Sequence, residues 1–189
     1  FNSSVIGIGP WEVQLPKAVF FVLGVILFWV SVNVTNCTDG VDGLCASLCS
    51  VTLLSMSLLF SQVLARYAMA NFLFIAVLFA YLYFNTSPSS MLMGDAGSRA
   101  LGFYIAVATL KSGHPLLYIL LAGVMIADGG IGLVKVSLKR FLGISILKNT
   151  RTPLHDHMRK NKGWSDTQVV VRYVILQVML AAAAFCLVG

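Results

Sequence analysis

Apolar residues dominate the chain in six long runs, and short stretches rich in turn residues separate most of them. A helix needs about 20 mostly apolar residues to cross a membrane. The pattern therefore predicts six spanning helices, at residues 17–35, 43–62, 67–84, 95–111, 115–138 and 168–188. We expect an all-α fold, a polytopic transmembrane helical bundle, in which residues 1–189 form a single transmembrane domain.

Two stretches do not fit the spanning pattern. Residues 1–16 contain Gly7, Gly9 and Pro10 among partly alternating apolar positions, which predicts a short hairpin on the membrane surface. Residues 139–167 are long, polar and basic, and they are predicted to form a loop.

Composition supports a membrane protein. Hydrophobic residues make up 58% of the chain and charged residues only 11%, whereas a soluble domain carries about 25% charged residues. The net charge of +6 does not point to nucleic acid, because seven of the 13 Lys and Arg residues lie in 139–167. Such a basic loop is expected on the cytoplasmic side. The four cysteines form no paired metal motif and are expected to be small core thiols: Cys37, Cys45, Cys49 and Cys186.

The order of the six runs then fixes which ends share a face. If 139–167 is cytoplasmic, the ends of the first and third runs are cytoplasmic too. Those ends carry two Gly-rich acidic motifs, 36–43 and 93–98, whereas the opposite connections hold few charged residues. The chemically rich stretches are thus expected to meet at one cytoplasmic site.

The first acidic motif contains Asp39 and Asp42, three residues apart and each followed by Gly. At that spacing both carboxylates share a face if the segment is helical, and glycine lets a backbone approach a ligand closely. Charges against a bilayer are costly and favour a functional role. The alternative is a pair of ordinary Asp-Gly turns at a helix end.

Asp95, in the second motif, opens the fourth run and could simply cap its helix. The functional interpretation is a ligand for Mg²⁺, which takes one or two carboxylates together with substrate phosphates. The two roles are compatible.

His155 and His157 follow Pro153 in the basic loop, close to Arg151. Zinc has no third ligand at a suitable spacing, so phosphate binding by the His residues and nearby cations is favoured over a merely solvated loop or a lipid-headgroup patch. Asp128 and Lys135 lie two turns apart in the fifth run, as either a functional or a buried structural pair.

Taken in order, these motifs resemble those of the polyprenyl-phosphate N-acetylhexosamine-1-phosphate transferases. The matching positions are Asn33-x-x-Asn36-x-x-Asp39-Gly-x-Asp42-Gly, Phe84-Asn85, Met93-Gly94-Asp95-x-Gly97-Ser98 and Pro153-x-His155-x-His157. Gly163-Trp164-Ser165-Asp166 and the Val169–Tyr173 stretch resemble the end of the bacterial phospho-N-acetylmuramoyl-pentapeptide transferases.

The resemblance implies a fold of ten transmembrane helices with an adjacent Asp-Asp pair near the active site, of which this chain would be the C-terminal portion. No Asp-Asp pair occurs in the sequence, so this portion alone is expected to be inactive. The family's triple His reads His155-Asp156-His157 here, and no role is carried over to Asp156.

The implied reaction moves phospho-MurNAc-pentapeptide from UDP-MurNAc-pentapeptide to undecaprenyl phosphate and releases UMP. Mg²⁺ is the implied cofactor and Asp95 its ligand. The implied catalytic residues are Asp39, Asp42, Asp95, His155 and His157, and the implied nucleotide- or substrate-binding residues are Asn36, Gly40, Val41, Asp42, Asn85, Arg151, His155 and His157.

The expected setting is the bacterial cytoplasmic membrane, with membrane lipid around the bundle and no nucleic acid as partner; a homodimer is allowed. Two alternatives stay open: a sister transferase that uses UDP-GlcNAc, and a non-enzymatic transporter or channel. The second would distribute its acids across the membrane depth, where only Asp128 fits.

Overall fold

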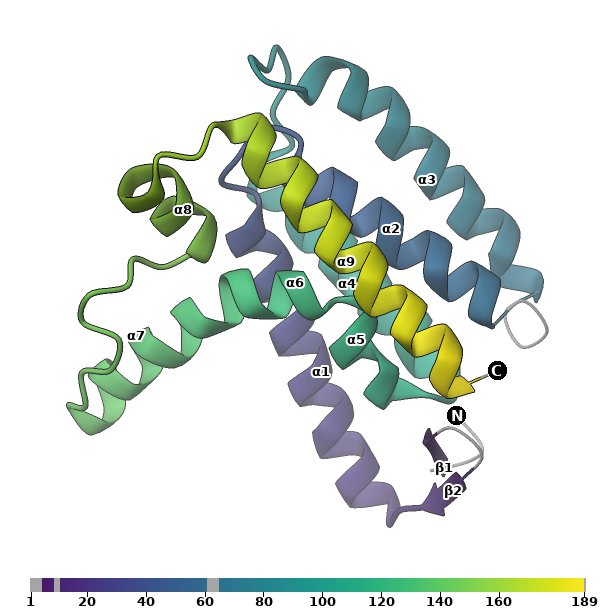
Figure 1. Ribbon diagram of the computed structural model, residues 1–189. Helices are drawn as coiled ribbons and strands as arrows, with labels where there is room; N and C mark the ends of the chain where they lie inside the picture. The colour runs from purple at the N-terminus through teal and green to yellow at the C-terminus, as the bar shows by residue number, and fades with distance from the viewer. Residues whose placement is uncertain (1–4, 9–10, 61–64, 189) are drawn as a thin grey trace.

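The computed structural model describes residues 5–8, 11–60 and 65–188. It begins with a hairpin in which strand β1 (Val5–Ile8) pairs antiparallel with β2 (Trp11–Gln14). The predicted hairpin is thus confirmed, and its location on a membrane surface stays a prediction. The amide of Gly7 donates a hydrogen bond of 2.9 Å to the carbonyl of Gly113. The hairpin therefore lies at the end of the bundle that is far from α8 (Leu154–Lys162) (Figure 1).

Long helices form at five of the six predicted runs, and their bounds are α1 (Lys17–Thr38), α2 (Leu44–Leu59), α3 (Ala65–Asn85), α4 (Gly94–Lys111) and α9 (Asp166–Val188). Helix α2 lies between α3 and α9, and α1 packs along α4 (Figure 1). Because α2 is surrounded, it carries much of the buried apolar core, including Leu44, Leu48, Leu53 and Met56.

The α1–α4 contact is close because one of its residues has no side chain. A Cβ atom at Gly102 would lie 2.6 Å from the carbonyl oxygen of Ser31. The hydroxyl of Ser31 uses this approach to donate a 2.7 Å hydrogen bond to the Gly102 carbonyl. Small residues at such crossings are typical of helix pairs in membranes.

The fifth run was predicted as one helix, and this prediction is wrong. It forms several pieces: η1 (Pro115–Leu117), α5 (Tyr118–Leu121), α6 (Gly123–Met125), the π-helical turn η2 (Ile126–Gly130) and α7 (Ile131–Leu142). The parts before and after Ala122 are bent by 73°. As a result α7 projects away from the bundle (Figure 1).

The fully buried side chain of Gln177 on α9 satisfies the backbone groups that this break leaves free. Its Oε1 accepts from the amide of Val124 at 3.0 Å, and its Nε2 donates to the carbonyls of Leu120 and Leu121 at 3.0 and 2.8 Å. Unpaired backbone groups are costly in an apolar setting. A single polar side chain thus stabilises a broken helix that apolar periodicity alone could not reveal.

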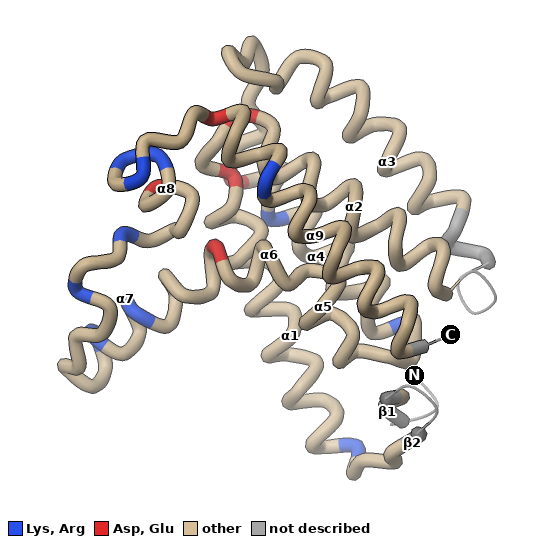
Figure 2. The backbone as a smooth tube through the Cα atoms, in the orientation of Figure 1, with Lys and Arg blue, Asp and Glu red and all other residues tan. Residues whose placement is uncertain are grey.

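The basic stretch 139–167 was predicted as a loop, but it contains the last turn of α7 and all of α8. Helix α8 begins after Pro153 and ends at Gly163, whose φ of 69° suits glycine at a helix end. Lys and Arg gather along α7, α8 and the segment between them (Figure 2).

Among the described residues, two helices, Lys17–Thr38 and Asp166–Leu187, are long and apolar enough to cross a membrane, and the bent pair Pro115–Leu121 and Gly123–Leu142 could supply a third. The protein is therefore a membrane protein, but six spans are not confirmed. Helix α2 has only 16 residues, and α4 carries Asp95, Arg99 and Lys111. These helices are shorter or more polar than a spanning segment should be.

Candidate functional site

The motifs predicted to share one face do meet in the structure. The turn after α1, the start of α4 and the start of α8 lie at the end of the bundle away from the hairpin, where acidic and basic residues lie near one another (Figure 2). The convergence of the motifs is thus a property of the fold, whichever side of a membrane they face.

Asp39 and Asp95 form the acidic part of this region. Asp39 directly follows α1 as its C-terminal cap residue, and Asp95 lies exposed in the first turn of α4, where Arg99 donates to it at 3.0 Å. Burial, and then the nearby charge of Asp95, raise the pKa of the Asp39 carboxyl from 3.8 to about 6. Two carboxylates that repel each other in this way favour a cation between or beside them.

Asn36 links the two acidic motifs directly. Its side-chain amide donates to Oδ1 of Asp95 and to the hydroxyl of Ser98, both at 3.1 Å. Since Asn36 lies one turn before Asp39 on α1, these bonds fix the end of α1 against the start of α4. The predicted role of Asn36 in substrate binding remains a prediction.

Asp42 and Asn85 hold the connection between α3 and α4. The carboxylate of Asp42 accepts from the backbone amide of Ser89 at 3.1 Å and from its hydroxyl at 2.8 Å. Buried Asn85 accepts from the amide of Gly43 at 2.8 Å and donates to the carbonyl of Met91 at 2.7 Å. Both side chains therefore position backbone, and Ser89 is a partner that the motif analysis missed.

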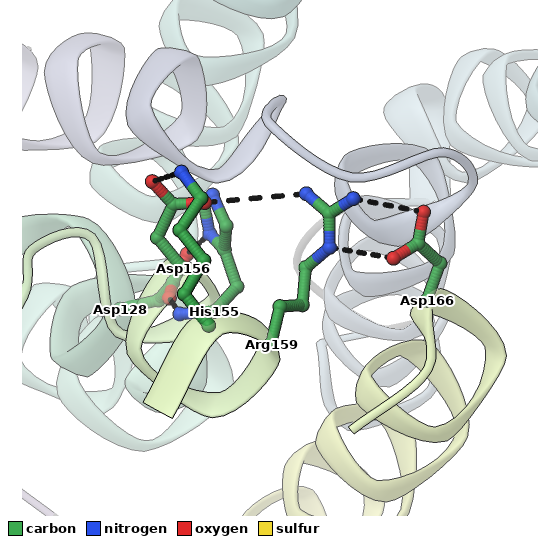
Figure 3. A network of polar contacts seen from close by, with 6 residues as sticks. Asp128, His155, Asp156, Arg159 and Asp166 are labelled. Atoms are coloured by element: carbon green, nitrogen blue, oxygen red, sulfur yellow. Dashed lines mark hydrogen bonds and ion pairs between the residues drawn. The ribbon is translucent and has the colours of Figure 1, made fainter. Parts of the chain in front are cut away.

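His155 is held by Asp128, a pairing that sequence spacing did not suggest (Figure 3). The backbone amide of His155 donates to Oδ1 of Asp128, and its Nδ1 lies 2.7 Å from Oδ2. Asp128 is fully buried in the π-helical turn η2, and His155 is 2% exposed. π-helical turns within helices are frequent at functional sites.

The opposite side of the His155 ring faces Gly40. A Cβ atom added at Gly40 would collide with Nε2 of His155 and lie 2.9 Å from its Cε1. The glycine after Asp39 is therefore required by the imidazole, which lies against the backbone of the Asp39–Asp42 turn. Val41, the next residue, is buried in the core.

The other basic-stretch residues mostly support local structure. His157 accepts from the amide of Arg151 through Nδ1 at 3.3 Å. Lys135, offered as a partner for Asp128, instead donates to the carbonyls of Leu147 and Thr150 at 3.1 and 2.7 Å. The sequence-based pairing of Lys135 with Asp128 was therefore wrong.

Helix α8 is fastened to α9 by an ion pair. The guanidinium of Arg159 contacts the carboxylate of Asp166, with Nη2 donating at 3.2 Å (Figure 3). Asp156 pairs with Lys160 at 2.9 Å on the exposed side of α8. The hydrogen bond from Lys160 is the main cause that lowers the pKa of Asp156. Asp156 thus has a local structural partner at the position where the family's central His was expected.

Two apolar grooves flank the broken helix beside Asp128. One has a volume of about 530 Å³ and is lined by α6, η2, α8 and α9, including Val124, Ala127, Asp128, Met158 and Trp164. The other, of about 520 Å³, runs between α1 and α7 and includes Trp29, Val30, Ile126, Val134 and Leu147. Both are suited to a long apolar chain.

Within the described residues no group of three or more His, Cys, Asp or Glu side chains surrounds a common point. A structural zinc site is therefore not supported there. Mg²⁺ needs fewer protein ligands, because one or two carboxylates suffice when substrate phosphates complete its coordination. Asp39 and Asp95 are suitable ligands, because both are carboxylates and a cation would relieve their mutual repulsion.

Comparison with known proteins decides the family. Residues 2–113 match glycosyl transferase family 4. A phospho-N-acetylmuramoyl-pentapeptide-transferase from Treponema pallidum is 46% identical over 178 residues, which cover 85% of this chain. The chain belongs to glycosyl transferase family 4.

Further relatives carry the same name. The protein from Clostridium acetobutylicum is 31% identical over 90% of the chain, and that from Flavobacterium johnsoniae is 29% identical over 90%. The chain spans about half the length of the curated relatives it matches: 49% of the Treponema protein, 53% of the Clostridium protein and 45% of the Flavobacterium protein.

Proposed function

We propose that this chain contributes the active-site face of a transferase that moves phospho-MurNAc-pentapeptide from UDP-MurNAc-pentapeptide to undecaprenyl phosphate and releases UMP. The observation that carries the proposal is the meeting of Asp39, Asp95 and His155 at one end of the bundle. The name of the Treponema pallidum relative, at 46% identity, supports the same reaction class.

Asp95, with Asp39 beside it, would hold Mg²⁺. When bound, the ion would neutralise diphosphate oxygens and stabilise the leaving UMP. Two features of the residues suit this role. Asn36 orients the Asp95 carboxylate by a hydrogen bond, and the raised pKa of Asp39 indicates a carboxylate without a nearby positive charge to stabilise it. Attack on a diphosphate depends mainly on positioning and charge neutralisation.

The turn from Asn36 to Gly43, together with Asn85, would form the nucleotide side of the site. Gly40 and Val41 would supply backbone near the uridine, whereas Asp42 and Asn85 act by fixing the surrounding loop. Because these bonds preset the backbone, little ordering would be needed when the donor binds.

His155, His157 and the cations near them would contact the donor phosphates. Arg151 is exposed, and arginine can bind phosphate through two parallel hydrogen bonds. The apolar grooves beside Asp128 would hold the polyprenyl chain, which brings its phosphate toward His155. The site would face the cytoplasm, where a UDP-sugar is available.

The test is a donor comparison with the complete protein, purified in detergent with Mg²⁺ and undecaprenyl phosphate. UMP release should occur with UDP-MurNAc-pentapeptide and not with UDP-GlcNAc. Release with UDP-GlcNAc alone would identify a sister transferase. Release with neither donor, in protein that remains folded, would reject the transferase proposal and favour the transporter alternative.

A further inference from the structure

We infer that Asp128 is a positioning residue that fixes the orientation and proton arrangement of the His155 imidazole, so that only Nε2 is presented to the Asp39–Asp42 turn. The effect of Asp128 on the reaction rests on the proposed function, but the contact between Asp128 and His155 does not depend on the substrate. It assigns a role to the buried acid of the broken helix.

The contact between the two side chains favours one arrangement of the ring. A carboxylate only accepts hydrogen bonds, so with Asp128 as the acceptor Nδ1 carries the hydrogen that it donates to Oδ2. The second oxygen of Asp128 accepts from the His155 backbone amide at 2.7 Å. Both carboxylate oxygens are therefore used, and side chain and backbone of His155 are fixed together.

The ring nitrogen that remains, Nε2, is directed at Gly40. No hydrogen bond joins Nε2 to another group in the described part of the chain. The glycine leaves room for Nε2 immediately beside the backbone that follows Asp39. The ring nitrogen that Asp128 does not hold is thus the one nearest the acidic motif.

Asp128 is itself held in place by a second close approach. A Cβ at the neighbouring Gly129 would lie 2.8 Å from Cβ of Cys37 and 2.9 Å from the carbonyl oxygen of Val34. The turn that carries Asp128 therefore packs directly on the last turns of α1, which Asp39 follows.

These contacts form a continuous series that starts and ends at the C-terminal end of α1. The end of α1 packs on Gly129 beside Asp128, Asp128 bonds to His155, and His155 packs on Gly40 in the turn after α1. Each contact in the series is either a short hydrogen bond or a close backbone approach that only glycine permits. In metal sites, a partner that holds the other ring nitrogen of a ligating His typically changes affinity or activity by about 10–100-fold when it is removed, and we expect an effect of the same order here.

The first arm of the test is kinetic and uses the complete protein. Asp128→Asn keeps the size of the side chain but can no longer accept from Nδ1 and from the backbone amide at the same time. We expect kcat to fall about 100-fold, with KM for the UDP-sugar changed less than about 3-fold. Asp156→Asn, the same substitution on α8, should leave both parameters near wild type.

The second arm is a spectroscopic measurement that needs no activity. ¹⁵N NMR of protein labelled at histidine, with the His155 signal assigned by its loss in His155→Gln, should show Nδ1 protonated under the conditions of the activity assay. In Asp128→Asn the ring should shift toward the form protonated at Nε2. Asp128→Glu, which keeps a carboxylate, should restore at least part of the wild-type signal and rate.

The two arms separate the two proposals. A wild-type His155 that is unprotonated at Nδ1 would overturn the positioning role, even if neither Asp128 variant folds. A folded Asp128→Asn protein with wild-type kcat and an unchanged ring would do the same. If the NMR result holds but neither UDP-sugar is turned over, the proposed reaction fails while the role of Asp128 in fixing His155 stands.

Discussion

Nε2 of His155 occupies the space where a side chain at Gly40 would begin. Gly40 directly follows Asp39, and His155 comes from α8, 115 positions further along the chain. One missing side chain thus allows an imidazole from the basic stretch to lie against the acidic motif. The contact explains physically why an Asp-Gly pair, rather than Asp followed by a larger residue, stands here.

Gly40→Ala is therefore expected to displace the imidazole and to lower transfer activity at least tenfold. Overpacking of a well-packed contact typically costs about 1–3 kcal/mol, so the thermal midpoint of the detergent-solubilised complete protein should fall as well. Gly24→Ala is the matched control, because the added methyl would meet only Cδ1 of Leu110 at 3.8 Å. Equal behaviour of the two variants would show that the His155 contact is unimportant.

Asn85→Ala tests whether Asn85 acts through the loop that it holds. The substitution leaves the buried amide of Gly43 without its acceptor, and it removes one of two donors to the carbonyl of Met91, which Tyr81 also contacts. A buried group that loses its partner costs about 1–3 kcal/mol, so the free energy of unfolding should fall by about that amount.

The control is Asn33→Ala, which removes an exposed amide that donates to the carbonyl of Trp29 within α1. Exposed substitutions usually change stability by less than about 0.5 kcal/mol. Denaturation of both variants in mixed detergent micelles, followed by circular dichroism, compares them. An Asn85→Ala protein as stable as Asn33→Ala would contradict the structural role.

Much of this architecture could be predicted from the sequence because apolar runs and turn residues are local signals. They located the helices that became α1, α2, α3, α4 and α9, and the hairpin before them. They could not reveal the break at Ala122, since the buried Gln177 that stabilises it is 55 positions away. Helix α8 was missed because it is too short and polar to show an apolar period.

The candidate site, like the fold, could be predicted from the sequence only in part. Motif order correctly brought the Asp39, Asp95 and His155 stretches together, because the number of helix reversals decides which ends share a face. It did not reveal Asp128 as the partner of His155, since that contact depends on the bend and on close packing at Gly129. The functional roles of the motif residues remain predictions.

The side of the membrane on which the site lies can be measured directly. Asn161→Cys, at the end of α8 in a cysteine-free background, should react with a membrane-impermeant maleimide only after cells are permeabilised. Lys111→Cys, at the opposite end of α4, should react in intact cells. The expectation follows from the seven basic residues of 139–167 and the preference of such loops for the cytoplasm. Labelling of the Asn161→Cys variant in intact cells would place the site on the outside.

Asp95→Asn should nearly abolish transfer while the protein stays folded. The Asp95 side chain is 77% exposed, and its ion pair with Arg99 lies on the surface, where such pairs contribute about 0–1 kcal/mol. Arg99→Gln is the control, because it removes the same ion pair but leaves the carboxylate. UMP release should persist in Arg99→Gln. Equal loss in both variants would mean that the ion pair, and not a metal ligand, is what activity requires.

The pKa of Asp39 predicts how metal affinity depends on pH. Because burial and Asp95 raise this pKa to about 6, the carboxylate that would bind a cation is protonated below that pH. Binding of Mn²⁺, used as a probe and followed by electron paramagnetic resonance, should weaken about tenfold per pH unit below pH 6. In Asp39→Asn the affinity should be lower and nearly constant from about pH 5 to 8.

The raised pKa of Asp39 also predicts how the free energy of unfolding changes with pH. The folded pKa lies above the ordinary value of 3.8, so the native state retains a proton that the unfolded chain has lost. The free energy of unfolding of the wild type, relative to Asp39→Asn, should therefore decrease as pH rises from about 4 to 6 and remain level above that. Saturating Mn²⁺ should remove the decrease by compensating the charge. A difference that rises with pH over this window would show that Asp39 has a stabilising partner and is not a free metal ligand.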